Sequence, residues 1–181
     1  MKIIFTGISS FTGYWFIKTL SEAGHEVVAT FKGNTEKYTD IRMRRVEELT
    51  KIVPCVFDCA FGSEAFIHLI EKENRIDLLC HHDAEVTNYK SPDFNVLNAL
   101  QNNTRNIQTV LRIIYDKHCR HLLLTGSIFE YNEGEGSDGL RAFSPYGLSK
   151  GLTAEMFRYY MERIGLNMGK FVISNTFGPY E

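Results

Sequence analysis

Tyr146 and Lys150, in the segment Tyr-Gly-Leu-Ser-Lys, are the residues whose types and spacing best suit proton transfer. If Tyr146 begins a helix, Lys150 lies one turn later on the same face. The ammonium would then favour ionisation of the phenol and lower its pKa from about 10. Such a tyrosine can take a proton from a hydroxyl or return one to a carbonyl. The alternative is an ordinary aromatic side chain at the start of a helix.

A glycine-bearing turn near the N-terminus suits a second task, phosphate binding. It reads Thr-Gly-Ile-Ser-Ser-Phe-Thr-Gly from Thr6 to Gly13, between an apolar segment and a helical pattern. Backbone N–H groups and the helix dipole at such a turn attract a pyrophosphate. Gly7 permits the tight turn and Gly13 permits close packing, but Ser10 stands where glycine normally lets the backbone approach the phosphate. We expect the small Ser10 side chain to be tolerated and its hydroxyl to donate to a phosphate oxygen, although a plain strand-to-helix connection is the alternative.

Elements that would position these residues alternate along the chain. Apolar runs without strict alternation predict parallel strands covered on both faces, and strand–helix alternation predicts a doubly wound α/β fold in one domain, residues 1–181. The predicted strands are Lys2–Thr6, Glu26–Thr30, Lys51–Phe57, Asp77–His81, His121–Thr125 and Lys170–Ser174. The predicted helices are Thr12–Ala23, Ser63–Lys72, Asp93–Lys117 and Tyr146–Ile164. Gly33–Thr39 and Asn132–Gly139 read as polar loops, the second either a surface loop or a flap over the active site.

Composition excludes several classes of partner. The 181 residues carry a formal net charge of -2, which gives no electrostatic case for nucleic acid or an anionic membrane. No apolar run approaches the roughly 20 residues that span a bilayer, and the N-terminus has no secretory signal pattern. We expect the four cysteines to be structural and reduced, which implies a cytoplasmic protein. Cys55 with Cys59, and Cys119 between two histidines, have loose metal-ligand spacing, but we expect no metal site.

Taken together, the motifs resemble the extended short-chain dehydrogenase/reductase family, of the NAD(P)-dependent sugar-nucleotide epimerase/dehydratase type. The Thr6–Gly13 turn is similar to that family's TGxxGxxG, and Tyr146–Lys150 matches its YxxxK. Ser127 stands where the family places its catalytic Ser or Thr. Asn175–Pro179, which reads Asn-Thr-Phe-Gly-Pro, is similar to the segment after the sixth strand. The resemblance covers essentially the whole chain and implies a Rossmann fold.

The resemblance also implies roles for individual residues. Ser127 and Tyr146 would bind the reacting oxygen of a nucleotide sugar or related small molecule, and Lys150 would also hold the nicotinamide ribose during hydride transfer. The cofactor-binding residues that we expect are Gly7, Ser9, Ser10, Phe11, Thr12, Gly13, Phe31, Lys32, Asp58, Cys59, His81, His82, Asp83, Asn103, Tyr146 and Lys150.

Some of these positions leave alternatives open. Asp58 would bind the adenine or cap the next turn, and the mid-helix asparagine of the family corresponds to Asn102 or Asn103. Asp83 replaces a family alanine after the fourth strand and would add a negative charge near the cofactor. The second strand ends without the carboxylate that NAD-preferring members place there. Lys32 follows that strand and would meet a 2′-phosphate, which favours NADP over NAD, or it is only a solvated lysine.

Three further expectations concern the kind of enzyme and its assembly. Ile128 and Phe129 stand where dehydratases carry an Asp-Glu pair, which favours an epimerase or a simple reductase. The sequence stops soon after Asn175–Pro179, so we expect no C-terminal substrate lobe. A non-catalytic dinucleotide-binding module, or the N-terminal part of a larger or split enzyme, is therefore the alternative. Surplus apolar residues on the Tyr146–Ile164 helix predict a homodimer: Leu152, Met156, Phe157, Tyr160, Met161 and Ile164.

Overall fold

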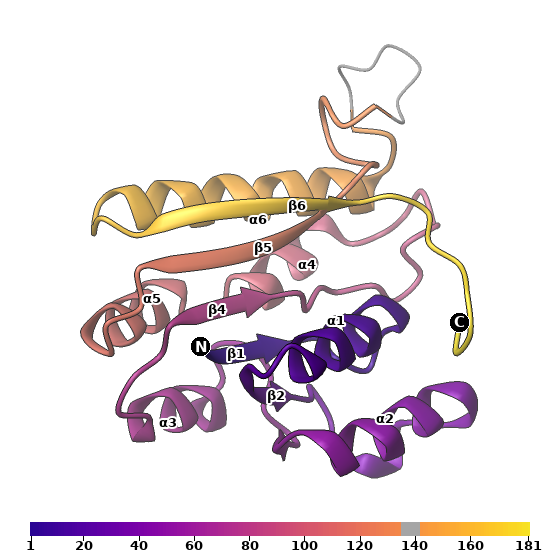
Figure 1. Cartoon of the computed structure of the whole chain (residues 1–181). Helices are drawn as coiled ribbons and strands as arrows, with labels where there is room; N and C mark the ends of the chain where they lie inside the picture. Colours follow the sequence, from indigo (N-terminus) through magenta and orange to yellow (C-terminus); the bar gives the residue numbers. More distant parts are fainter. Residues whose placement is uncertain (135–141) are drawn as a thin grey trace.

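A computed structural model of the chain describes residues 1–134 and 142–181. Its centre is a six-stranded parallel sheet with the strand order β3-β2-β1-β4-β5-β6 (Figure 1). The strands are β1 (Lys2–Thr6), β2 (Glu26–Thr30), β3 (Cys55–Val56), β4 (Leu78–His81), β5 (His121–Ser127) and β6 (Asn167–Ile173). The order reverses direction between β1 and β4, as in a Rossmann fold. The predicted doubly wound parallel sheet is confirmed.

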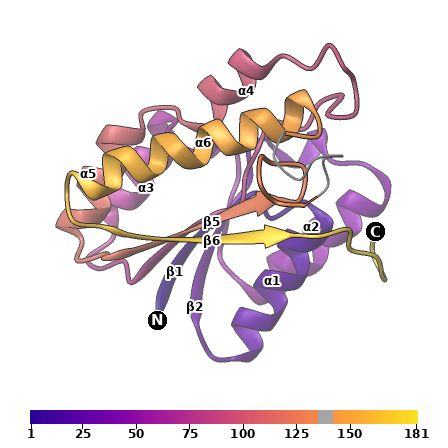
Figure 2. The same cartoon turned by 90° about the horizontal axis from the view of Figure 1, so that it is seen from above.

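Helices cover both faces of this sheet (Figure 2). On one face lie α1 and α2, and on the other lie α3, α5 and α6, with α4 beside α6. The helices are α1 (Phe11–Glu22), α2 (Asp40–Ile52), α3 (Glu64–Lys72), α4 (Val96–Asn103), α5 (Ile107–Asp116) and α6 (Pro145–Glu162), with a short 3-10 turn, η1, at Thr35–Lys37. None of the helices in the described ranges is both long and apolar enough to cross a bilayer.

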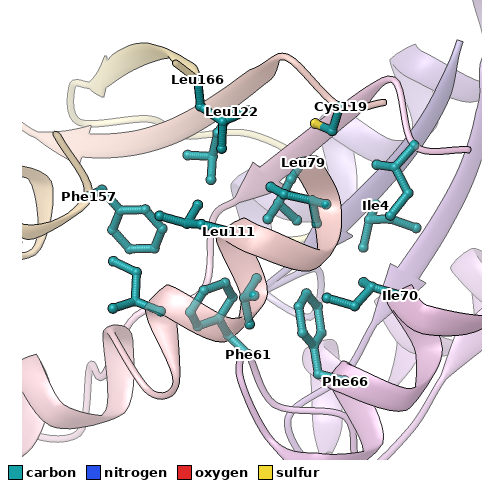
Figure 3. Close-up of a cluster of buried hydrophobic side chains, with 14 of the residues drawn as sticks. Ile4, Phe61, Phe66, Ile70, Leu79, Leu111, Cys119, Leu122, Phe157 and Leu166 are labelled. Atoms are coloured by element: carbon teal, nitrogen blue, oxygen red, sulfur yellow. The ribbon is translucent and has the colours of Figure 1, made fainter. Parts of the chain in front are cut away.

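Each face of the sheet has its own apolar core. The larger core packs α3, α5 and α6 against β4 and β5, and Figure 3 shows Phe61, Leu79, Leu111 and Phe157 meeting there. The smaller core packs α1 and α2 against β1 and β2, with Ile17 and similar side chains fully buried. Apolar burial on both faces explains why the strand sequences lack polar alternation.

The prediction of a third strand over Lys51–Phe57 is wrong at its beginning. Residues up to Ile52 belong to α2, a helix that the sequence analysis missed, and β3 is only Cys55–Val56. Val46 and Leu49 are buried at a helical spacing and hold α2 against α1. Pro54 lacks an N–H donor and separates the helix from the strand.

The single long helix predicted over Asp93–Lys117 is also wrong, because the structure divides it into α4 and α5. Asn106, between them, has the left-handed backbone conformation, with φ of 51°. Its side-chain amide donates to the Gly62 carbonyl over 2.9 Å. Asparagine tolerates this conformation better than other non-glycine residues and competes for backbone hydrogen bonds, so it interrupts the helix.

Candidate active site

A cleft of about 640 Å³ lies at the carboxyl ends of the strands, where ligands bind in open α/β sheets. It spans the position where the strand order reverses between β1 and β4. Twelve of the residues singled out from the sequence line it: Gly7, Ser9, Ser10, Phe11, Thr12, Phe31, Lys32, His82, Asp83, Ser127, Tyr146 and Lys150. The fold therefore brings the glycine-bearing turn and the proposed proton-transfer residues to one cavity.

Other residues from the same set lie outside the cleft. Asp58 is exposed beyond β3, with a left-handed φ of 50°, and Cys59 is buried in the larger core. Asn103 is buried and ties α4 to α6 through Thr153, over 3.3 Å. Gly13 and His81 lie behind the cleft lining, in the packing that supports it. None of these five residues lines the cavity.

Gly7 and Ser10 shape the turn between β1 and α1. Gly7 has a φ of 76°, and a Cβ atom on it would lie 2.6 Å from the backbone nitrogen of Asp83, so no other residue fits without displacement. Ser10 is the N-cap of α1 and accepts a hydrogen bond from Gly13 N over 3.0 Å. The Ser10 hydroxyl donates to the Gly7 carbonyl over 3.0 Å. In the ligand-free protein the hydroxyl thus has a partner within the turn, and its donation to a phosphate oxygen stays a prediction.

Two arginines of α2 converge on Ser9 in the same turn. Arg42 donates to the Ser9 hydroxyl from Nε over 3.0 Å and from its terminal nitrogen over 2.7 Å. The buried Arg45 donates to the Ser9 carbonyl over 3.0 Å. Arg42 also lines the cleft, which makes it the functional candidate that sequence reasoning missed. The apolar spacing of Val46 and Leu49 would have revealed the helix that carries it.

The neighbouring histidines His81 and His82 are both held inside polar networks. His81 contacts Thr6 Oγ1 through Nδ1 and the Asn103 carbonyl through Nε2, each over 3.0 Å. His82 contacts Thr125 Oγ1 through Nδ1 over 2.9 Å, and its Nε2 faces the turn before α1. Burial, together with the Lys150 charge, lowers the pKa of each imidazole to about 3. Both rings are neutral at physiological pH.

Ser127 ends β5 at the cleft and is fixed by a short turn. Its backbone N–H donates to Oε1 of the buried Glu130 over 2.7 Å. Its side-chain oxygen accepts from the Phe129 backbone over 3.2 Å, which leaves the hydroxyl hydrogen available to a ligand. Lys170 of β6 donates to Glu130 Oε2 over 3.1 Å and also pairs with Glu133. The Glu130 carboxylate is thus turned away from the cleft.

Tyr146 lies in the first turn of α6, which begins at Pro145 after the N-cap Ser144. Gly147 lies so close to the Phe129 carbonyl that any side chain there would overlap it. This close approach holds the beginning of α6 against the turn that follows Ser127. Tyr146 packs edge-on against Tyr89 and Phe94, with ring centroids 5.4 and 5.9 Å apart.

Burial sets the acidity of the Tyr146 and Lys150 pair. Burial, together with the Glu130 charge, raises the pKa of Tyr146 to about 12. Burial lowers the pKa of Lys150 to about 8, although Glu130 and Asp83 oppose this. The expected lowering of the tyrosine pKa is therefore wrong for the ligand-free protein, because loss of hydration and the Glu130 charge both raise it.

Charged groups also line the end of the cleft that lies beyond β2 and β4. Lys32 donates to Glu85 over 2.9 Å, and Glu85 also accepts from Asn102 over 3.4 Å. Asp83 lines the cleft, and burial raises the pKa of its carboxyl while Lys32 and Lys150 oppose that rise. The lysine expected to meet a phosphate is thus already paired with a carboxylate in this structure.

Residues after β6 run towards α2, as Figure 1 shows. Ser174, Asn175 and Thr176 line the cavity. Further along, Trp15 donates to the Pro179 carbonyl over 3.2 Å, and Arg45 donates to the Tyr180 carbonyl. The segment that resembles the family's motif is thus attached to α1 and α2.

Two other predictions can be placed in the fold. Most of the proposed flap, Asn132–Gly139, lies outside the described residues. On α6, Phe157 and Met161 are buried against the sheet, whereas Leu152 is 39% exposed, so only part of the surplus apolar surface remains open. Within residues 1–134 and 142–181, no three His, Cys, Asp or Glu side chains are grouped to hold a metal ion.

Comparison with known structures shows the same fold at low sequence identity. UDP-glucuronic acid 4-epimerase from Bacillus cereus, solved with NAD, matches all of this chain with a TM-score of 0.76 and 18% identity. DesIV, a dTDP-glucose 4,6-dehydratase from Streptomyces venezuelae solved with NAD and TYD, matches all of this chain with a TM-score of 0.74 and 19% identity. Gre2 from Candida albicans, solved with NADPH, matches 99% of the chain with a TM-score of 0.70 and 16% identity. The chain spans 58%, 58% and 59% of these three proteins, respectively.

Comparison at the level of sequence gives the family. The chain is 29% identical over 90 residues to NADH dehydrogenase [ubiquinone] 1 alpha subcomplex subunit 9, mitochondrial, from Dictyostelium discoideum. The aligned residues are half of this chain and 24% of that protein. The model of the NAD dependent epimerase/dehydratase family matches residues 3–181. With that match over nearly its whole length, the chain belongs to the NAD dependent epimerase/dehydratase family.

Proposed function

We propose that this chain binds a nicotinamide dinucleotide and positions it for hydride transfer to or from a nucleotide sugar or a related small molecule. The observation that carries the proposal is the shared cleft. The helix N-terminus at Ser10 and the Ser127, Tyr146 and Lys150 side chains open into one cavity of about 640 Å³. Its volume lies within the usual range of about 300–1,000 Å³ for small-molecule and cofactor sites.

The cavity fits the two ends of such a cofactor. Gly7 brings the chain close to β4 without a side chain, so the backbone beside the α1 N-terminus can approach a pyrophosphate. At the other end, Lys150 would hold the nicotinamide ribose, and Ser127 would donate to the reacting oxygen. The cofactor, when bound, accepts or supplies the hydride, and the protein orients the reactants.

Tyr146 is suited first to the role of proton donor. A phenol with a pKa of about 12 keeps its proton at neutral pH and can give it to a carbonyl oxygen as that oxygen gains charge. Glu130 is turned to Ser127 N and Lys170, so it does not supply a carboxylate to the cleft. The placement of Glu130 favours a reductase or an epimerase over a 4,6-dehydratase.

NADP is the cofactor that we favour. Thr30, Phe31 and Lys32 line the cleft without a carboxylate for a ribose 2′-hydroxyl. Arg42 lies in the same lining and adds a guanidinium, the group that best matches phosphate geometry. Since Lys32 is paired with Glu85, Arg42 is the main candidate for a 2′-phosphate.

A homodimer in the cytoplasm is the setting that we propose. The exposed face of α6 carries Leu148, Leu152 and Tyr159, which are 45%, 39% and 56% exposed, and Leu97 of α4 is 77% exposed. A second copy would cover these side chains. The four cysteines are free thiols, which suits a reducing compartment. Light scattering that gives a monomer mass at tens of micromolar would contradict the dimer.

A second candidate is a dinucleotide-binding module without catalysis. The raised pKa of Tyr146 favours it, because an unassisted phenol of this kind is a poor base. The partial similarity to a protein named as a subunit of an NADH dehydrogenase is compatible with it.

One paired experiment separates the candidates. Thermal unfolding with NADH and NADPH reports binding, because a ligand of the native state raises its stability. Oxidation and reduction of the cofactor with a panel of nucleotide sugars then compares wild type with Tyr146→Phe. We expect both proteins to bind and only wild type to turn over. Binding without turnover in either protein would support the module, and no binding would contradict both candidates.

A further inference from the structure

The search for a further role leads to His82, whose ring lies between the phosphate-binding turn and β5. Its Nε2 lies 2.9 Å from Ser10 Oγ and 3.0 Å from Thr12 Oγ1. Its Nδ1 lies 2.9 Å from Thr125 Oγ1, two residues before Ser127. The ring is enclosed by Phe5 and Phe16, with centroids 5.9 and 5.7 Å away. One side chain thus connects the turn with the strand that carries Ser127.

The hydrogen bonds of Ser10 determine which nitrogen of His82 carries the proton. A serine hydroxyl has one donor hydrogen and two acceptor lone pairs. We assign the hydrogen of Ser10 to the Gly7 carbonyl, 3.0 Å away, and one lone pair accepts from Gly13 N. Only a lone pair remains for His82, so Nε2 must donate to it. In the neutral ring Nδ1 is then the acceptor, and Thr125 Oγ1 donates to it.

This protonation of His82 determines the direction of the hydrogen bond with Thr12. Because Nε2 carries a hydrogen, Thr12 Oγ1 can only accept from it, and the hydroxyl hydrogen of Thr12 must point elsewhere. Thr12 lies in the first turn of α1 and lines the cleft. Its hydroxyl hydrogen is therefore available to an anion at the helix N-terminus, where the backbone N–H groups also point.

We infer that His82 is a positioning residue, locked with its proton on Nε2, that makes the Thr12 hydroxyl a donor to the pyrophosphate of the bound dinucleotide. The inference deepens the proposed function and rests on it. It also explains how the turn works with Ser10 in place of glycine, since the Ser10 side chain is drawn towards His82 and Gly7 O. Two separate measurements test it, one without ligand and one with ligand.

The first measurement is the tautomer in the ligand-free protein. Long-range ¹H–¹⁵N correlation spectra of ¹⁵N-histidine-labelled wild type at pH 7 distinguish the two neutral forms and the cation. The His82 signal is assigned by its loss in His82→Gln or, if that variant does not fold, by its shift in Thr125→Val. We expect the Nε2–H pattern. An Nδ1–H pattern, a cation, or an average of the two neutral forms overturns the inference.

The second measurement is a double-mutant cycle on the Kd of NADPH. We expect Thr12→Val and His82→Leu each to raise Kd about tenfold, the loss of one hydrogen bond, and the double variant to raise it no further. Thr19→Val, the same change on an exposed position of α1, should leave Kd unchanged. An unchanged Kd in His82→Leu, or independent losses that multiply to about a hundredfold in the double variant, contradicts the inference alone. A wild type that binds neither NADH nor NADPH contradicts the proposed function and the inference together.

Discussion

The backbone N–H of Ser127 donates to the carboxylate of Glu130 over 2.7 Å, and only 2% of Glu130 is exposed. The other carboxylate oxygen accepts from Lys170 on the neighbouring strand. The end of β5 and the middle of β6 are therefore joined through one buried charge. Ser127 receives its position from this pair.

Glu130→Gln should weaken that junction. The amide oxygen can still accept from Ser127, but Lys170 loses a charged partner, so we expect unfolding free energy to fall by about 2 kcal/mol. Urea denaturation measures the change. Glu133→Gln is the matched control, since Glu133 pairs with the same lysine but is more exposed. Equal losses in the two variants would argue against a special role for the buried carboxylate.

His81 and His82 should make the fold sensitive to acid. Because burial lowers their pKa from 6.5 to about 3, the unfolded chain binds more protons between these values. Stability is therefore fully present above about pH 6.5 and is lost as pH falls. Two such groups give a slope of up to about 2.7 kcal/mol per pH unit.

Urea denaturation at pH 7.5, 6.5, 5.5 and 4.5 measures this slope. His82→Leu should reduce it by about half, because one of the two titrating groups is removed. The window ends near pH 4.5, where carboxyl groups such as Glu85, whose pKa is lowered to about 2, begin to contribute. A flat profile between pH 6.5 and 4.5 would contradict the prediction.

Gly147→Ala and Gly151→Ala should have opposite effects within the same helix. A methyl group at position 147 overlaps the Phe129 carbonyl, and overpacking of this kind costs about 1–3 kcal/mol. At position 151 a methyl group meets nothing within 4 Å, and alanine gains about 0.5–1 kcal/mol of helix propensity. Thermal unfolding of the two variants checks the signs. Equal signs would show that helix propensity, rather than the close contact, dominates.

Arg42→Ala should weaken NADPH more than NADH. We expect about a tenfold rise in the Kd of NADPH, because one exposed ionic contact with the 2′-phosphate is lost. Fluorescence titration with both cofactors measures the ratio. Arg44→Ala, on the same helix but outside the cleft lining, should leave the ratio unchanged. Equal losses for NADPH and NADH in Arg42→Ala would assign the arginine to the turn at Ser9 instead.

The sequence was sufficient to predict the architecture of the sheet, but not the places where individual helices begin and end. Continuous apolar strands such as Ile3–Phe5 predict a covered parallel sheet, and that prediction is confirmed. The break at Asn106 was missed because an asparagine within a helical pattern has the same spacing whether or not it adopts positive φ. The helix Asp40–Ile52 was missed because most of its residues are polar and only a few of its side chains are buried.

For the candidate site, too, the sequence predicts some features and the tertiary structure decides the others. Spacing relates Tyr146 to Lys150 within one helix, but burial decides their pKa values, and burial depends on distant residues such as Tyr89 and Phe94. Arg42 meets Ser9 across 33 residues of sequence, and Glu130 is held by Lys170 of β6 across 40, and neither tertiary contact can be read from local spacing. Their roles therefore required the structure.

The contact between Gly147 and the Phe129 carbonyl has a consequence for how the site is assembled during folding. Ser127 belongs to β5 and Tyr146 to α6, so their separation depends on how these two elements pack against each other. The docking of α6 against β5 and the turn that follows it brings the two side chains into register. The site should consequently form as one of the last events on the folding pathway and be among the first features lost when the protein is mildly destabilised.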